Sequence, residues 1–188
     1  MAILAGDALL SSAFQLVAEK TPDTVSVERK LELIIRMGKA CGPMGLAGGQ
    51  VHDLECEGKN DVTLTDLRWI HHHKTAALLE LAAVGGAIAG GATQAEVDAL
   101  QKFAVDIGLA FQVADDILDV TQTSEELGKT AAKDLDSDKA TFPKLMGLEE
   151  SKLEAKRLSE EAKSALAMFG DRAKPLLAIA DFIIERKN

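Results

Sequence analysis

The segment from Ile107 to Val120 holds three aspartates in a pattern that is otherwise apolar and helical, and it contains no lysine or arginine. At 100° per residue, its polar side chains follow the i, i+3, i+4, i+7 spacing and fall within one stripe roughly 100° wide. They are Gln112, Asp115, Asp116 and Asp119. The rest of the circumference is apolar and is expected to be buried, so the acidic stripe is expected to line an interior space.

The composition favours helices throughout the chain. Of the 188 residues, 47% are hydrophobic, which suffices for the core of one domain, whereas only 4% are aromatic and tyrosine is absent. Alanine, leucine, glutamate and lysine, all good helix formers, are abundant. We therefore expect an all-α protein in which residues 1–188 form a single helical domain.

Charge and hydropathy exclude two classes of partner. The net charge is -9, so the chain lacks the basic surface that binds nucleic acid. The most apolar run, residues 76–92, contains Glu80 and four glycines and is shorter than the ~20 residues of a membrane span, so it is expected to be a buried helix. The first ten residues lack the basic start of a secretory signal.

Apolar periodicity predicts helices over most of the chain, with loops at 59–63 and 128–144 and a kink in the glycine-rich residues 41–49. The helices are expected over residues 2–19, 27–39, 49–58, 65–91, 97–120, 149–169 and 174–185. Thr93 with Glu96, and Thr123 with Glu126, have the spacing of capping boxes. Pro143 is expected near the start of a helix.

The acidic stripe predicts a cation nearby, because neighbouring buried carboxylates repel one another unless a positive charge offsets them. Ligands that are all oxygen favour a hard cation. Mg²⁺ keeps several waters and is usually held by one or two carboxylates together with substrate phosphates, so it suits an incomplete cage better than Ca²⁺ does. The alternative is an ordinary solvated helix face with Asp116 and Asp119 exposed.

Lysines near the stripe are candidate phosphate ligands. Lys129, Lys133 and Lys139 lie in the loop that follows it, where ammonium groups can bind phosphate oxygens, or can simply be solvated. Lys74 precedes the apolar run, where it needs an anionic partner or must extend to solvent. The three histidines of HHHKT point about 100° apart on a helix and cannot form one zinc site.

Four stretches, GGQVHDLECEG, IHHHKTAALLE, FQVADDILDV and GKTAAKDLDSDKATFPKL, together resemble the trans-prenyl diphosphate synthases in order and spacing. The resemblance is closest to geranylgeranyl diphosphate synthases of plant-plastid or cyanobacterial type and covers essentially the whole chain. It implies the C-terminal portion of an isoprenoid-synthase helical bundle. It also implies a prenyltransferase that adds isopentenyl diphosphate to an allylic diphosphate with Mg²⁺, giving geranylgeranyl or farnesyl diphosphate.

The resemblance assigns roles to particular residues. Three groups are implied: metal ligands, lysines that bind the allylic diphosphate, and polar groups beside the developing allylic cation. They are, in that order, Asp115, Asp116 and Asp119, with Asp53 bordering the other metal cluster; Lys74, Lys129 and Lys139; and Thr75 with Gln112. Lys133 is left out of the set. Without the resemblance, Gln50 and Asp53 would be read as a hydrogen-bonding pair between helices.

The chain also departs from the family pattern. A first aspartate-rich motif, an arginine pair and a Gly-Lys-Arg segment precede the matched region in the family, and none is found in these 188 residues. Met1 is therefore expected to correspond to an internal position of the family fold. The chain alone is expected to bind Mg²⁺ and diphosphate weakly with little or no turnover, and product length cannot be assigned.

Assembly and location follow from the same resemblance. A homodimer, or a heteromer with another prenyl synthase chain, is expected, in the bacterial cytosol or the plastid stroma. A non-catalytic partner or complementing fragment is the first alternative. A terpene cyclase is the second, and the GQxxD and HKT motifs disfavour it.

Overall fold

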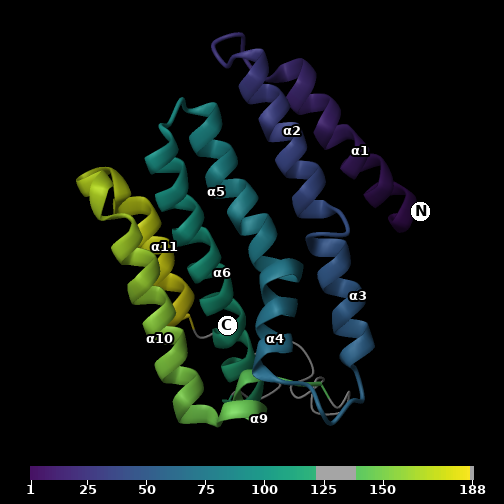
Figure 1. Ribbon diagram of the computed structural model, residues 1–188, viewed down its shortest axis with the longest axis vertical. Coiled ribbons are helices and arrows are strands. Elements are labelled where there is room, and N and C mark those ends of the chain that lie inside the picture. Colours follow the sequence, from purple (N-terminus) through teal and green to yellow (C-terminus); the bar gives the residue numbers. More distant parts are fainter. Residues whose placement is uncertain (122–138, 187–188) are drawn as a thin grey trace.

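The computed structural model describes residues 1–121 and 139–186, and every regular element within them is helical, as the sequence predicts (Figure 1). The α-helices are α1 (Ala2–Lys20), α2 (Val27–Cys41), α3 (Leu46–Cys56), α4 (Leu64–His71), α5 (Ala77–Ala89), α6 (Gln94–Thr121), α9 (Phe142–Met146), α10 (Leu148–Ala165) and α11 (Lys174–Glu185). A π-helical turn, η1 (His72–Ala76), joins α4 to α5, and a 3-10 segment, η2 (Ala167–Ala173), joins α10 to α11.

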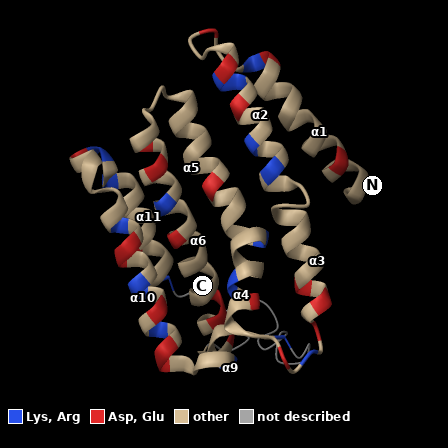
Figure 2. Ribbon diagram, viewed as in Figure 1, with Lys and Arg blue, Asp and Glu red and all other residues tan. Residues whose placement is uncertain are grey.

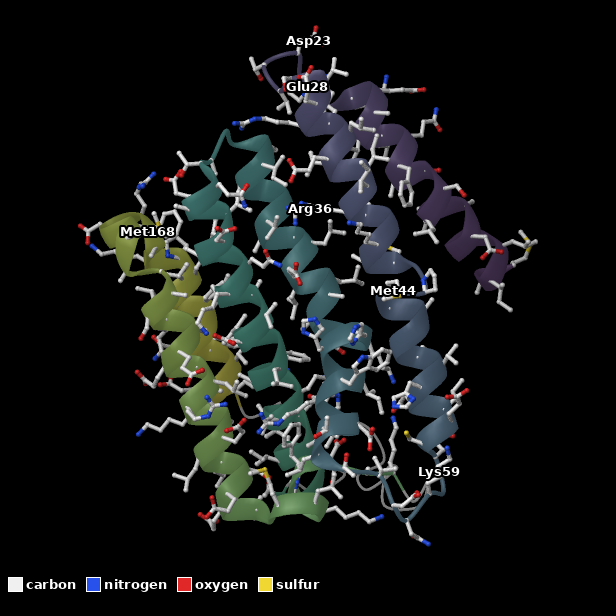
Figure 3. All side chains as sticks on the ribbon, viewed as in Figure 1. Asp23, Glu28, Arg36, Met44, Lys59 and Met168 are labelled. Atoms are coloured by element: carbon white, nitrogen blue, oxygen red, sulfur yellow. The ribbon has the colours of Figure 1, made fainter. Side chains whose placement is uncertain are left out.

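The long helices lie side by side in layers (Figure 1). The purple α1 forms one edge and packs on α2, α5 lies between α2 and α6, and the green-yellow α10 and α11 cover the other side of α6. Lys59, just beyond α3, marks the end of the bundle near α9, whereas Asp23 and Glu28 mark the opposite end (Figure 3). Met44 lies where the chain turns from α2 into α3, the predicted kink.

The central helix α6 begins at Gln94, directly after the predicted capping residue Thr93 and three residues before the predicted range 97–120. The Thr93 backbone N–H donates to Glu96 Oε2 at 2.9 Å, and the Glu96 backbone N–H donates to Thr93 Oγ1 at 3.4 Å, so the pair satisfies two N–H groups at the start of the helix. The corresponding pair Thr123 and Glu126 lies outside the described residues. Pro143 lies in the first turn of α9, also as predicted.

Side chains from α4, α6, α9, α10, η2 and α11 form the main core, and α6 and α10 contribute most of it. Its buried members are Leu67, Phe103, Ala104, Ile107, Ala110, Val113, Phe142, Ala155, Leu158, Ala162, Leu166, Ala173, Ala180 and Ile183. Burial of this apolar surface fixes one face of α6 and leaves the acidic stripe to face elsewhere.

The predicted continuous helix over 65–91 is interrupted in the structure. Thr63 caps α4 through reciprocal hydrogen bonds with Asp66, and η1 then inserts its wider turn before α5. Two glycines hold η1 tightly. A Cβ on Gly49 of α3 would lie 2.3 Å from the backbone nitrogen of Lys74. A Cβ on Gly108 of α6 would lie 2.7 Å from the Ala76 Cβ. The backbone around Lys74 therefore touches both neighbouring helices directly.

The outer helix α1 differs from the others because it has no buried residue. Figure 2 shows few charged positions along it. It is the one described helix that is long and apolar enough to cross a membrane, by length and composition alone. Those two properties do not distinguish a spanning helix from one that packs on protein. The run predicted as a buried helix corresponds mainly to α5, whose Val84 and Ile88 are buried.

Candidate diphosphate and metal site

A cavity of about 260 Å³ lies near the end of the bundle formed by α9. Residues from α3, α4, η1, α6 and the segment before α9 surround it. They are Asp53, Leu67, His71, Lys74, Gln112, Asp115, Asp116, Asp119, Lys139, Ala140 and Thr141. The four polar residues of the predicted stripe therefore face one cavity, with two predicted phosphate-binding lysines on its other sides.

Donors from the described residues orient Asp116 and Asp115 of the stripe. The Phe142 backbone N–H donates to Asp116 Oδ2 at 2.8 Å, so the start of α9 orients that carboxylate. The Arg186 guanidinium donates to Asp115 Oδ1 at 2.7 Å. Since each carboxylate has two oxygens, one such bond leaves further lone pairs for a ligand.

The wall opposite the stripe is an ionic cluster of one carboxylate and two lysines. Lys74 Nζ lies 2.6 Å and Lys139 Nζ 3.4 Å from Asp53 Oδ2. Burial by itself would raise the pKa of Asp53, but the hydrogen bond from Lys74 and the charge of Lys139 outweigh it, so the pKa lies below its usual value. Asp53 is thus the anionic partner that Lys74 requires. Both ammonium groups hold further protons that can reach phosphate oxygens.

Thr75 and Gln112, the residues expected beside an allylic cation, contact each other. The Thr75 hydroxyl donates to Gln112 Oε1 at 3.1 Å, which joins η1 to α6. The π-helical turn presents Lys74 and Thr75 in succession. A hydroxyl and an amide carbonyl both offer oxygen dipoles that can stabilise positive charge.

His71 is a site residue that the sequence did not single out. It lines the cavity with its side chain only 12% exposed, and its Nε2 lies 3.7 Å from Asp116 Oδ2. Neither ring nitrogen has a hydrogen-bond partner within the described part of the chain. The ring stacks on Phe142 with centroids 5.7 Å apart. The only sequence feature that pointed to His71 was the HHHKT motif. Considering that motif as a set of zinc ligands does not single out His71.

The oxygen ligands around the cavity suit an open Mg²⁺ site better than a site in which protein ligands fill every coordination position. Among residues 1–121 and 139–186, no group of three His, Cys, Asp or Glu side chains converges on one point. The carboxylates on α6 instead line an open wall of the cavity, where oxygen ligands leave room for waters and phosphate oxygens. Lys129 and Lys133 lie outside the described residues.

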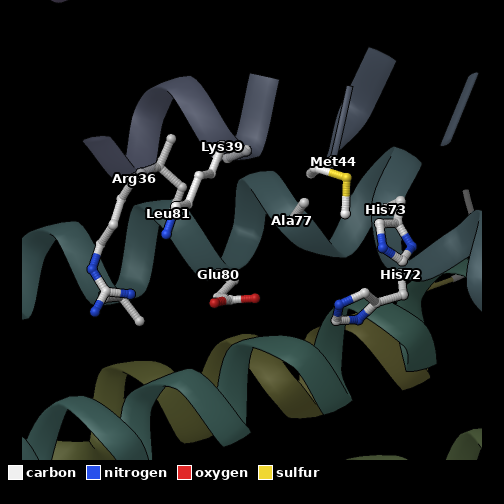
Figure 4. A pocket seen from close by; sticks show the side chains of 10 residues that line it. Arg36, Lys39, Met44, His72, His73, Ala77, Glu80 and Leu81 are labelled. Carbon is white, nitrogen blue, oxygen red and sulfur yellow. The ribbon is translucent and has the colours of Figure 1, made fainter. Parts of the chain in front are cut away.

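A second cleft, of about 160 Å³, lies between α2 and the η1–α5 segment (Figure 4). Arg36 and Lys39 reach into it from α2, and His72 and His73 lie at its other end. Glu80 points toward α6, where its carboxylate accepts a hydrogen bond from Gln101 at 2.8 Å. Among the predicted site residues that the structure describes, none lines this cleft.

Comparison with known proteins gives a consistent family signal. The model of the polyprenyl synthetase family matches residues 1–171. The chain is 54% identical to a heterodimeric geranylgeranyl pyrophosphate synthase large subunit 1 of Arabidopsis thaliana and 52% identical to a chloroplastic geranylgeranyl pyrophosphate synthase of Capsicum annuum. Each match covers 100% of this chain and 52% or 51% of the relative. The chain thus spans about half the length of these curated relatives.

Solved structures agree in fold. A geranylgeranyl pyrophosphate synthetase from Pyrococcus horikoshii superposes with a TM-score of 0.86 at 29% identity, over 99% of this chain and 67% of that one. A geranyltransferase from Helicobacter pylori, complexed with magnesium and isoprenyl diphosphate, superposes with a TM-score of 0.77 at 35% identity, over 97% and 58%.

Proposed function

The chain belongs to the polyprenyl synthetase family, and from this premise we propose that it forms part of a trans-prenyltransferase. The reaction joins isopentenyl diphosphate to an allylic diphosphate and yields geranylgeranyl or farnesyl diphosphate. The main support is the cavity that places Asp115, Asp116 and Asp119 opposite Lys74 and Lys139. Residues 1–188 are proposed to lie within one helical domain.

The carboxylates of α6 would hold Mg²⁺, with Asp53 bordering a further metal cluster. When bound, Mg²⁺ supplies positive charge that offsets the charge of a diphosphate leaving group. Lys74 and Lys139, together with Lys129 from outside the described residues, would bind the diphosphate oxygens. Lys74 can keep one N–H on Asp53 while another reaches phosphate, because an ammonium group has three donors.

The chemistry proceeds by loss of the leaving group. The allylic C–O bond breaks, and the departing diphosphate takes the electron pair while the lysines neutralise its growing charge. The double bond of isopentenyl diphosphate attacks the allylic carbon to form a C–C bond, and the resulting cation loses a proton to the diphosphate. The oxygens of Thr75 and Gln112 would stabilise the allylic cation. Because the diphosphate takes the proton, no side chain is required as a general base.

Binding of inorganic pyrophosphate with Mg²⁺ tests the site directly. The melting temperature of the 188-residue chain should rise when both are present, because a ligand that binds the folded state stabilises it. Asp115→Asn keeps an acceptor for Arg186 but removes the charge, and it should abolish most of the rise. Asp98→Asn is the matched control, since Asp98 lies on the same helix, exposed and hydrogen-bonded to Gln94. Equal shifts in the three proteins would disprove the assignment.

A complementing subunit is the second candidate function, favoured by the heterodimeric large subunit among the relatives. In this case the chain supplies the second aspartate-rich wall, and another chain supplies further metal ligands. Incorporation of radiolabelled isopentenyl diphosphate separates the two candidates. Turnover by the purified chain alone favours a self-sufficient enzyme or homomer, and turnover only after mixing with a second synthase chain favours the heteromer. The chloroplastic relatives support a plastid location, with the bacterial cytosol as the alternative.

A further inference from the structure

Arg186 connects the end of α11 to the acidic stripe from outside the cavity. Its Nη2 donates to Asp115 Oδ1 at 2.7 Å and to the Phe111 carbonyl at 3.4 Å. Its guanidinium carbon lies 4.0 Å from the centre of the Phe111 ring. One side chain thus contacts two successive turns of α6 by a hydrogen bond, an ion pair and a cation–π contact.

The environment of Arg186 holds this contact in place. Its side chain is only 12% exposed, and its buried Nε has no hydrogen-bond partner among residues 1–121 and 139–186. Removing a guanidinium from water is costly unless an anion compensates for it, and Asp115 is the carboxylate that pairs with Arg186 in the described residues. The Asp115 side chain remains 45% exposed and lines the cavity. The same aspartate therefore faces Arg186 and the site.

We propose that Arg186 is a positioning residue for the metal-dependent diphosphate site, acting through Asp115. This role rests on the proposed function. Three aspartates on one helix repel one another and can adopt several rotamers, so a fixed guanidinium on one oxygen of Asp115 selects its orientation and leaves the other oxygen for the ligand. The ring face of Phe111 keeps the guanidinium in one plane, which a lysine cannot reproduce fully.

A competing effect has the opposite sign. The positive charge of Arg186 would repel a cation, so its removal would tighten metal binding if repulsion dominated. We expect positioning to dominate because Arg186 approaches from the α11 side and is not among the cavity-lining residues. Partners of metal-binding side chains typically change metal affinity or activity by about 10- to 100-fold when removed. The direction of the change thus distinguishes positioning from repulsion.

The experiment measures binding of Mg²⁺ with inorganic pyrophosphate by calorimetry in the 188-residue chain. Arg186→Met keeps the apolar length of the side chain and removes every donor, and it should weaken binding about 10- to 100-fold and raise the Mg²⁺ concentration needed for half-saturation. Arg186→Lys retains the charge and should recover part of the loss. Lys163→Met is the matched control, because the 2.7 Å pair of Lys163 with Asp181 ties α11 to α10 without touching α6.

Each outcome decides one question. Weaker binding in Arg186→Met, with partial rescue by lysine and normal binding in Lys163→Met, supports the positioning role. Equal or tighter binding in Arg186→Met overturns that role and leaves the proposed function intact. An equal loss in Lys163→Met also overturns it, because docking of α11 alone would then account for the effect. Absence of binding in the unmodified chain overturns the proposed function itself.

Discussion

The two sides of the candidate site are built very differently. On one side, α6 has eight buried residues and packs against α10, which has six. On the other side, α3 has only two, Gly49 and Asp53, and the outer helix α1, which contributes no residue to the cavity, has none. Figure 2 shows charged positions in bands along α10 but few along α1. The outer face of α10 is therefore suited to water, whereas α1 exposes apolar side chains such as Ile3 and Leu9.

The difference shows where the precision of the site originates. The aspartates project from α6, whose apolar face packs in the main core, so we expect their wall to be the more rigid of the two. The wall that carries Asp53 depends instead on the direct contact of Gly49 with η1 and on the ion pair with Lys74. Substitutions that affect one wall at a time test this contrast.

The largest effect is expected at Phe142, which joins the core to the site. Its side chain is fully buried, it stacks on His71, and its backbone orients Asp116. Phe142→Ala should lower the free energy of unfolding by ~3 to 5 kcal/mol, the usual cost of emptying a buried phenylalanine site. Leu9→Ala on α1, where the side chain is 71% exposed, should change it by less than about 0.5 kcal/mol. Urea denaturation of both variants measures the contrast, and comparable losses would contradict it.

A smaller effect is expected where α3 touches η1. A Cβ on Gly49 would lie 2.3 Å from the backbone nitrogen of Lys74. Gly49→Ala should therefore separate α3 from η1 and lower the free energy of unfolding by about 1 to 3 kcal/mol. The same substitution at Gly38 of α2 meets nothing within 4 Å and should stabilise by roughly 0.5 to 1 kcal/mol, because alanine is the better helix former. Denaturation midpoints give both values. A neutral Gly49→Ala would show that the α3 wall can move without cost.

Much of the fold was predictable because it depends on local signals. Periodicity identified the long helices, and the structure confirms the predicted capping box of Thr93 and Glu96 at the start of α6. The π-helical turn was not predicted, since residues 72–76 contain no proline or glycine that would mark a break in the helix. The turn packs closely against Gly49 and Gly108, which belong to helices distant from it in sequence. The prediction for 149–169 ran past the end of α10 at Ala165, where a 3-10 segment follows.

The site was predictable where residues share one helix, and less so where the partner is remote. The i, i+3, i+4, i+7 spacing placed the α6 aspartates on one stripe, and the structure brings that stripe to a single cavity. The position of Lys74 indicated either an anionic partner or extension to solvent, and periodicity did not identify Asp53 as that partner. Arg186 and His71 were missed because their contacts depend on tertiary packing. Their functional roles remain predictions.

The smallest effect is expected from the charge of Asp53 as pH falls. Its pKa is lowered in the folded chain, despite a burial effect that acts to raise it, because Lys74 and Lys139 favour the ionised form. A group whose pKa is lower when folded stabilises the fold at pH values above the unfolded pKa, about 3.9 for aspartate, and this contribution is lost as pH falls through the folded pKa. The stability difference between wild type and Asp53→Asn should therefore narrow below about pH 4. Both lysines are more than a quarter exposed, at 30% and 27%, so solvent screens the interaction and keeps the change below those at Phe142 and Gly49.

Lys74→Met removes the closest charge and should reduce the same acid dependence, measured by urea denaturation from pH 6 to pH 2.5. A difference that stays constant or widens on acidification would mean that these lysines do not stabilise the ionised carboxylate, and that the α3 wall is held by packing at Gly49 alone.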